Sequence, residues 1–171
     1  MKKIWFFLLA LPLSACATRP TADEPTYAQA SARGAQVDQA HSRVVVFRSD
    51  GHKRMRNADA RIILNGAQVA SIGPGSFIMD DIEPGASAVS VNAFGTTTCT
   101  VSFSAQPGET EFFEITPGEP GRVERLSGAF GLLGAAATSA VSQCNELIIQ
   151  QVQRQVAVQA LANTRLIPLS R

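Results

Sequence analysis

The stretch that decides the fold is Ala60-Arg61-Ile62-Ile63-Leu64-Asn65-Gly66-Ala67-Gln68-Val69-Ala70-Ser71-Ile72. Asn65-Gly66 separates two runs of strand-forming residues. A two-residue hairpin turn needs positive φ at both positions, and Asn and Gly adopt that conformation more readily than other residues. The stretch therefore predicts a β-hairpin.

Further strands are predicted on both sides of this hairpin. Residues 43–48 are β-branched and aromatic, and residues 87–94 and 98–104 alternate between apolar and polar side chains. Pro-Gly dipeptides mark turns at 74–75, 84–85, 107–108 and 117–118. Turn signals about every eight to twelve residues, with no helices alternating between the strands, predict an antiparallel β-sandwich of about seven strands over 41–126.

The chain after residue 126 has a different pattern. Residues 127–137 are small and apolar, with glycines at 128, 131 and 134. One stripe at helical spacing contains Ile148, Ile149, Val152, Val156 and Ala160. This spacing predicts a helix over 145–163. Residues 127–171 are therefore expected to form a Gly/Ala-rich segment and a C-terminal helical appendage to the mainly β domain.

The N-terminal residues are typical of a secretion signal. Lys2 and Lys3 precede an apolar core over 4–13, which is much shorter than the roughly twenty residues needed to span a bilayer. Leu13-Ser14-Ala15-Cys16 resembles the lipobox of bacterial lipoproteins, in which cleavage precedes a cysteine that becomes lipidated. We therefore expect a signal peptide over 1–15 and a lipidated Cys16. The alternative is an ordinary signal that happens to contain a cysteine.

Residues 16–40 are predicted to be a flexible tether that begins at the lipidated cysteine. The segment is rich in Pro, Thr, Ala and Gln, has Tyr27 as its one aromatic residue, and shows no hydrophobic period. Such a segment buries too little surface to offset the entropy lost on ordering. A short helix over 27–35 is compatible with this composition.

Composition and charge exclude some classes of partner. The 171 residues are 45% hydrophobic and 17% charged, as in an ordinary globular protein, and the formal net charge is +1. Removal of Lys2 and Lys3 with the signal leaves a charge of about −1. This balance argues against nucleic acid as a partner.

Cys99 and Cys144 remain after Cys16 is assigned to lipid. An even pair of cysteines in an oxidising compartment predicts a disulfide, and the alternating strand around Cys99 directs that side chain to the core. The alternative is two separately buried thiols. No His or carboxylate lies at ligand spacing from either cysteine, so no metal or other cofactor is expected.

No catalytic constellation is visible in the sequence. Asp80, Asp81 and Glu83 are carboxylates, but adjacent residues of a strand point to opposite faces, so the two aspartates diverge. Neither His41 nor His52 has a neighbouring arrangement typical of a triad. We therefore expect no enzymatic activity, and no small-molecule substrate is identifiable.

Two segments are weaker candidates for contact with a membrane or a partner. His52, Lys53, Arg54 and Arg56 lie in one loop and would contact phosphate head groups or an acidic partner; the alternative is a solvated loop. The uncharged Gly/Ala-rich segment is expected to pack on the β domain or on a partner protein. Alternatively, residues 127–141 dip into the bilayer.

Several short motifs occur in the order seen in a family of short bacterial lipoproteins with a domain of unknown function. They are Arg43-Val44-Val45-Val46-Phe47-Arg48, Asn65-Gly66, Gly75-Ser76-Phe77, Ile82-Glu83-Pro84-Gly85, Pro107-Gly108-Glu109 and Phe112-Phe113. The resemblance covers roughly residues 40–116 and implies a transthyretin-like or PEGA-like β-sandwich in the cell envelope. It implies no catalytic residues.

These features together predict a lipid-anchored periplasmic protein that acts as a non-enzymatic binding or structural module of the envelope, with an envelope protein as its possible partner. Ala17 follows the cysteine, whereas an Asp in that place implies retention at the inner membrane in well-studied sorting systems. The outer membrane is therefore expected, with the domain facing the periplasm. The alternative is a membrane-active protein that inserts its Gly/Ala-rich segment into the bilayer.

Overall fold

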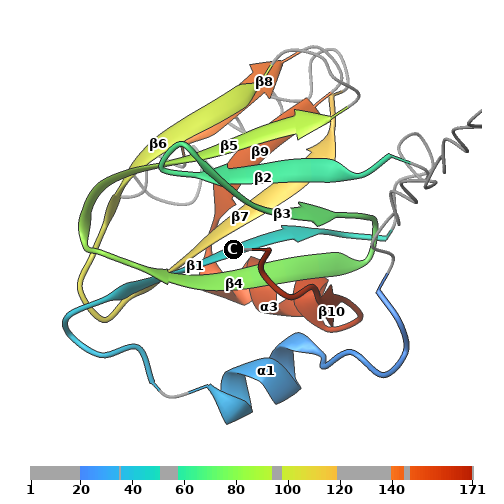
Figure 1. Ribbon diagram of the computed structural model, residues 1–171, viewed down its shortest axis with the longest axis horizontal. Coiled ribbons are helices and arrows are strands. Elements are labelled where there is room, and N and C mark those ends of the chain that lie inside the picture. The colour runs from blue at the N-terminus through green and yellow to red at the C-terminus, as the bar shows by residue number, and fades with distance from the viewer. Residues whose placement is uncertain are drawn as a thin grey trace, which may run out of the picture.

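The computed structural model describes residues 20–34, 36–50, 58–93, 98–118, 140–144 and 147–170. Within these residues the protein is mainly β, with ten strands in two sheets and two helices (Figure 1). The predicted signal peptide, Cys16, the basic residues His52, Lys53, Arg54 and Arg56, and the Gly/Ala-rich segment 127–137 lie outside the described residues.

The predicted hairpin is confirmed at one edge of the smaller sheet. β2 (Ala60–Leu64) and β3 (Ala67–Ile72) pair in antiparallel fashion around Asn65 and Gly66, which have φ values of 49° and 86°. β2 also pairs with β5 (Gly85–Ala93), and β5 pairs with β6 (Cys99–Ala105). The four-stranded sheet therefore has the order β3-β2-β5-β6.

The larger sheet has six strands in the order β10-β4-β1-β7-β9-β8. Its centre is β1 (Ser42–Arg48), flanked by β4 (Ser76–Ile82) and β7 (Thr110–Pro117). β9 (Leu147–Val152), β8 (Val141–Cys144) and the short β10 (Arg165–Leu166) complete it. β1 and β7 are parallel, because the chain passes through the four-stranded sheet before it returns beside β1. β10 and β4 are also parallel, so the expectation of a purely antiparallel arrangement is wrong at both pairs.

One apolar core receives side chains from both sheets. Val44 and Val46 of β1 and Phe113 of β7 meet Ile62 of β2 and Val91 of β5, and all five are fully buried. Strand side chains alternate between two faces, so the intervening residues of β1 and β7 point to the opposite face of the six-stranded sheet. We call this opposite face the outer face.

The predicted disulfide joins the edges of the two sheets. Cys99 begins β6 at the edge of the four-stranded sheet, and Cys144 ends β8 at the edge of the six-stranded sheet. Their Cα atoms are 5.5 Å apart, although the residues are 45 positions apart in the chain. Cys99 is fully buried, as its place in an alternating strand predicts.

The prediction of a helix over 145–163 is wrong in its first half. Leu147–Val152 is β9, which pairs with β7 on one side and with β8 on the other, and only Arg154–Leu161 is helical, as α3. Adjacent Ile148 and Ile149 are both fully buried, because Ile149 enters the core between the sheets while Ile148 points to the other face. A strand covered on both faces explains two successive buried isoleucines. Val141–Cys144 and Leu147–Val152 are therefore strands of the six-stranded sheet and not parts of an appendage.

Within the segment 16–40, expected to be a flexible tether, the structure has the short helix that the composition also allowed. Tyr27–Arg33 forms α1, which begins with a capping box between Thr26 and Gln29. α1 and α3 lie on the outer face, away from the four-stranded sheet (Figure 1). Tyr27 packs edge-on against Phe77 and Phe112 at ring-centroid distances of 5.8 and 6.0 Å. These contacts form a second apolar cluster that holds α1 to the sheet.

Neither helix in the described part of the chain is long and apolar enough to cross a membrane.

Candidate functional site

A polar pocket of about 350 Å³ lies on the outer face of the six-stranded sheet. Its floor contains Arg43 of β1, Met79 of β4 and Thr110 of β7. One wall is α1, another contains Gly34, Gln36, Val37 and Gln39, and Arg154 at the start of α3 closes a third side. The register places Arg43 beside both Thr110 and Asp81, so the floor follows directly from strand alternation.

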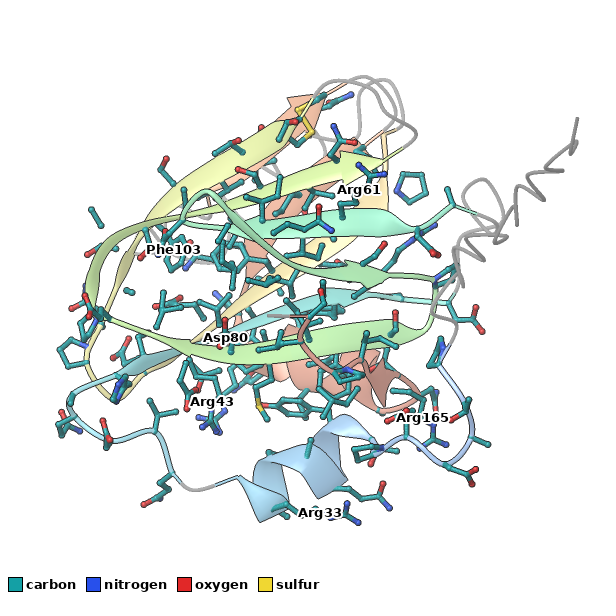
Figure 2. All side chains as sticks on the ribbon, viewed as in Figure 1. Arg33, Arg43, Arg61, Asp80, Phe103 and Arg165 are labelled. Atoms are coloured by element: carbon teal, nitrogen blue, oxygen red, sulfur yellow. A yellow bond between two sulfur atoms is a disulfide. The ribbon has the colours of Figure 1, made fainter. Side chains whose placement is uncertain are left out.

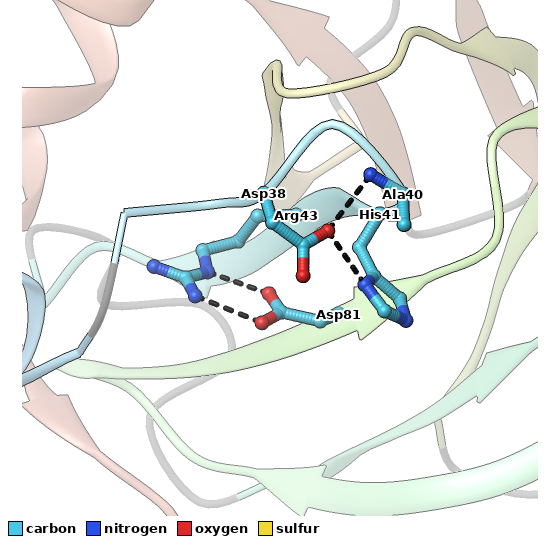
Figure 3. A network of polar contacts seen from close by, with 5 residues as sticks. All are labelled: Asp38, Ala40, His41, Arg43 and Asp81. Carbon is cyan, nitrogen blue, oxygen red and sulfur yellow. Dashed lines mark hydrogen bonds and ion pairs between the residues drawn. The ribbon is translucent and has the colours of Figure 1, made fainter.

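Arg43 is held in place by a bidentate ion pair with Asp81 (Figure 3). Arg43 Nε donates to Asp81 Oδ1 at 2.6 Å, and Nη2 donates to Oδ2 at 2.8 Å. The Arg43 side chain is 12% exposed and the Asp81 side chain 44%. The hydrogen bonds from Arg43 hold the pKa of Asp81 below its ordinary value, and the same bonds raise the pKa of Arg43. The pair therefore fixes a guanidinium group at the pocket floor.

A second polar group orders the loop that leads into β1. Asp38 Oδ1 accepts a hydrogen bond from the backbone N–H of Ala40 at 2.8 Å and lies 2.9 Å from His41 Nδ1 (Figure 3). The hydrogen bond from His41 lowers the pKa of Asp38. The loop also contacts the turn before β7, where Gly108 donates its N–H to the His41 carbonyl oxygen at 2.8 Å. Gly108 has a φ of +72°, and a Cβ there would lie 2.6 Å from Gln39 Nε2.

Tyr27 supplies the aromatic wall of the pocket. The residue is only 9% exposed, and its hydroxyl makes no hydrogen bond to any residue that the structure describes. Burial raises the pKa of Tyr27, while the positive charges of Arg154 and Arg43 act in the opposite direction. The phenol group therefore lies within electrostatic reach of both guanidinium groups.

The structure separates the carboxylates considered as an acid–base pair. Asp80 shares the buried face of Ile78 and is 8% exposed, whereas Asp81 is on the outer face with Arg43. In Figure 2, Arg43 lies between the sheet and the segment that carries α1. The two aspartates therefore diverge, as strand geometry predicts. The candidate contact residues His52, Lys53, Arg54 and Arg56 and the lipidation candidate Cys16 lie outside the described ranges.

The pocket was not predicted from the sequence. Tyr27, Arg43 and Arg154 come from distant parts of the chain and meet only in the folded protein. One local signal was available for α1, because Thr26 followed three residues later by Gln29 is typical of a helix start. No comparable signal marks Arg154 as a neighbour of Tyr27.

Comparisons with known proteins give no relative. No family model matches the chain, and neither does any curated protein or solved structure. Among the described residues, no group of three or more His, Cys, Asp or Glu side chains could hold a metal ion. The side chains that line the pocket offer guanidinium, hydroxyl and amide groups.

Replacement of Asp81 by asparagine is expected to lower stability at neutral pH by about 0.5–1 kcal/mol, a modest value because Asp81 is partly exposed and screened by solvent. The folded-state pKa of Asp81 lies below its ordinary value of 3.8. The ion pair therefore makes its full contribution to folding stability above pH 3.8, and this contribution is lost as the pH falls through the folded-state pKa of Asp81. Urea unfolding of both proteins at pH 7 and pH 3 measures the difference.

The matched control for this prediction is Glu83→Gln. Glu83 is an exposed carboxylate just after the same strand and makes no ion pair among the described residues. Equal destabilisation by the Asp81→Asn and Glu83→Gln variants would contradict a specific role for the Arg43–Asp81 pair.

Proposed function

We propose that the protein is a bacterial envelope lipoprotein, anchored through Cys16, whose β body acts as a non-enzymatic binding or structural module facing the periplasm. The observation that carries the proposal is Leu13-Ser14-Ala15-Cys16 at the end of a short apolar core. The Cys99–Cys144 disulfide supports it, because such bonds persist in oxidising compartments outside the cytoplasm. Ala17 in place of an acidic residue supports the outer membrane as the site of anchoring.

The finer fold assignment is part of the same proposal. We infer a β-sandwich of the transthyretin-like or PEGA-like type. It is supported by two sheets that share one apolar core and by the Asn65-Gly66 hairpin at the expected place. The parallel β1–β7 pair and the strands after residue 126 are additions to the arrangement that the resemblance implies.

Because α1 is packed on the sheet, the linker between the lipidated Cys16 and the folded β domain is shorter than the predicted tether. The chain joins the body at Thr26, which forms a bridge with Arg165, and Pro25 accepts a hydrogen bond from the Leu166 N–H at 2.9 Å. Thr26 is ten positions after Cys16, and ten residue-to-residue steps span at most about 35 Å when fully extended. The proposal therefore places the β body close to the membrane surface, where it would meet membrane-bound partners or envelope components.

Labelling of growing bacteria with palmitate tests the anchor. The wild-type protein and the control Thr18→Ala, which leaves the lipobox-like motif intact, are expected to incorporate label and to sediment with outer-membrane fragments. The Cys16→Ser variant is expected to incorporate none, because the acylated thiol is absent. A wild-type protein that remains unlabelled would contradict the proposal, and labelled protein in inner-membrane fragments would contradict the sorting assignment.

A further inference from the structure

We propose that the pocket over Arg43 binds a small hydrophilic molecule through a carboxylate or phosphate group, held by Arg154 and the hydroxyl of Tyr27. The inference rests on the proposed role as a binding module, because it names the class of ligand that such a module would take. It does not depend on the lipid anchor, and its test is separate from the palmitate test.

Tyr27 provides the first argument. Its ring is fixed between α1 and the sheet by edge-on contacts with Phe77 and Phe112, and the residue is nine-tenths buried. The Tyr27 hydroxyl makes no hydrogen bond to a described residue, and its oxygen is not enclosed, because Thr116 Oγ1 is the one enclosed side-chain oxygen without a partner among the described residues. The hydroxyl is therefore accessible from the pocket that Tyr27 lines. A rigid, preformed donor is therefore available to a molecule in the pocket.

The second argument is the charge around the pocket. Arg154 is exposed and makes no ion pair within the described part of the chain. None of the described residues that line the pocket is a carboxylate, and both oxygens of nearby Asp81 already accept from Arg43. The lining therefore has an excess of positive charge, which favours an anion and disfavours a cation.

The start of α3 adds to this preference. Gln153 is the N-cap residue of α3 and makes no side-chain capping hydrogen bond. The first backbone N–H groups of the helix therefore lack the usual side-chain acceptor, at the end where the helix dipole is positive. Arg154 is the first helical residue, so its guanidinium group and these N–H groups are presented by the same turn.

Other side chains that line the pocket include uncharged polar groups, which could bind the uncharged part of the ligand. Gln36, Gln39 and Thr110 offer amide and hydroxyl groups, which can bind hydroxyl or amide groups of a ligand. Ser31 already donates its hydroxyl to the Tyr27 carbonyl oxygen at 2.7 Å, so its oxygen remains an acceptor. A volume of about 350 Å³ is near the lower end for ligand pockets and suits a small acid.

Calorimetric titration of the detergent-solubilised full chain tests the inference. The probes are glutarate for the carboxylate class and inorganic phosphate for the phosphate class, with glutaramide as the uncharged counterpart of glutarate. We expect glutarate or phosphate to bind and glutaramide to bind at least about tenfold more weakly. The probe that binds more tightly identifies which of the two groups the pocket prefers.

Three variants assign the binding to the pocket. Arg154→Gln is expected to weaken binding of the preferred probe about tenfold or more, and Tyr27→Phe, which keeps the ring, about three- to tenfold. The control is Arg33→Gln, which removes the same charge from the side of α1 away from the sheet (Figure 2). Arg33 does not line the pocket, so this variant is expected to bind as the wild type does.

Two results would overturn the inference. The first is that neither anion binds more tightly than glutaramide up to about 10 mM. The second is that Arg33→Gln weakens binding as much as Arg154→Gln, which would show a diffuse surface charge effect. Thermal unfolding of each variant confirms that its fold is intact. Palmitate labelling of the same proteins reports on lipidation of Cys16 separately, so a negative binding result and a negative lipidation result can be told apart.

Discussion

The Cys99→Ala/Cys144→Ala double variant is expected to lose about 4 kcal/mol of unfolding free energy relative to the oxidised wild type. The disulfide closes a loop that spans 45 residues of separation, and it joins the edge strands of the two sheets. The loss arises mainly because the unbridged unfolded chain is less restricted, so its entropy is higher. Urea unfolding followed by circular dichroism measures the change.

Reduced wild-type protein is the control for this variant. Cys99 is fully buried, so its replacement by alanine also removes packing atoms from the core. Reduction breaks the bridge and leaves both sulfur atoms in place, and most of the destabilisation should therefore remain. Identical urea midpoints for the oxidised and reduced wild type would contradict a stabilising role for the disulfide.

The second large effect is expected at Ile149, whose replacement by alanine should destabilise the fold by about 2–5 kcal/mol. Ile149 is fully buried in the core between the sheets, and its strand, β9, pairs on both sides. Val156, in α3, is 42% exposed, and Val156→Ala should change stability by no more than about 0.5 kcal/mol. Urea unfolding of the two variants gives both values.

This pair of residues discriminates between two interpretations of the tail. A continuous amphipathic helix over 145–163 places Ile149 and Val156 on the same apolar stripe, so their truncation would have similar effects. The structure places Ile149 inside the sheet and Val156 on the surface. Similar losses of stability in the two variants would therefore contradict the assignment of β9.

The strands between residues 42 and 117 were predictable because their signals are local. Asn65-Gly66 requires a tight turn whatever the rest of the chain does, and the alternation around Cys99 places its sulfur in the core. The pairing of Cys99 with Cys144 followed from the number of cysteines available. The hairpin and the burial of Cys99 depended on a few neighbouring residues, and the disulfide depended on a count of cysteines, so none of these predictions needed knowledge of the tertiary contacts.

The elements at the two ends of the described chain depend on contacts made far away in sequence. Leu147-Ile148-Ile149 fits a helical stripe as well as a strand, and only the neighbours β7 and β8 select the strand. Tyr27 stands in a polar segment that would be disordered alone, and the apolar outer face of the sheet orders it. The pocket combines these ends with β1, so the same long-range contacts determine where its side chains lie.

The proposed envelope role depends most on acylation of Cys16, and the mass of the N-terminal peptide of the purified membrane protein tests this acylation directly. We expect the mature chain to begin at Cys16 and to carry the added mass of a lipid on that residue. A chain that begins elsewhere, or a Cys16 of unmodified mass, would contradict the proposed anchor and the envelope role that follows from it.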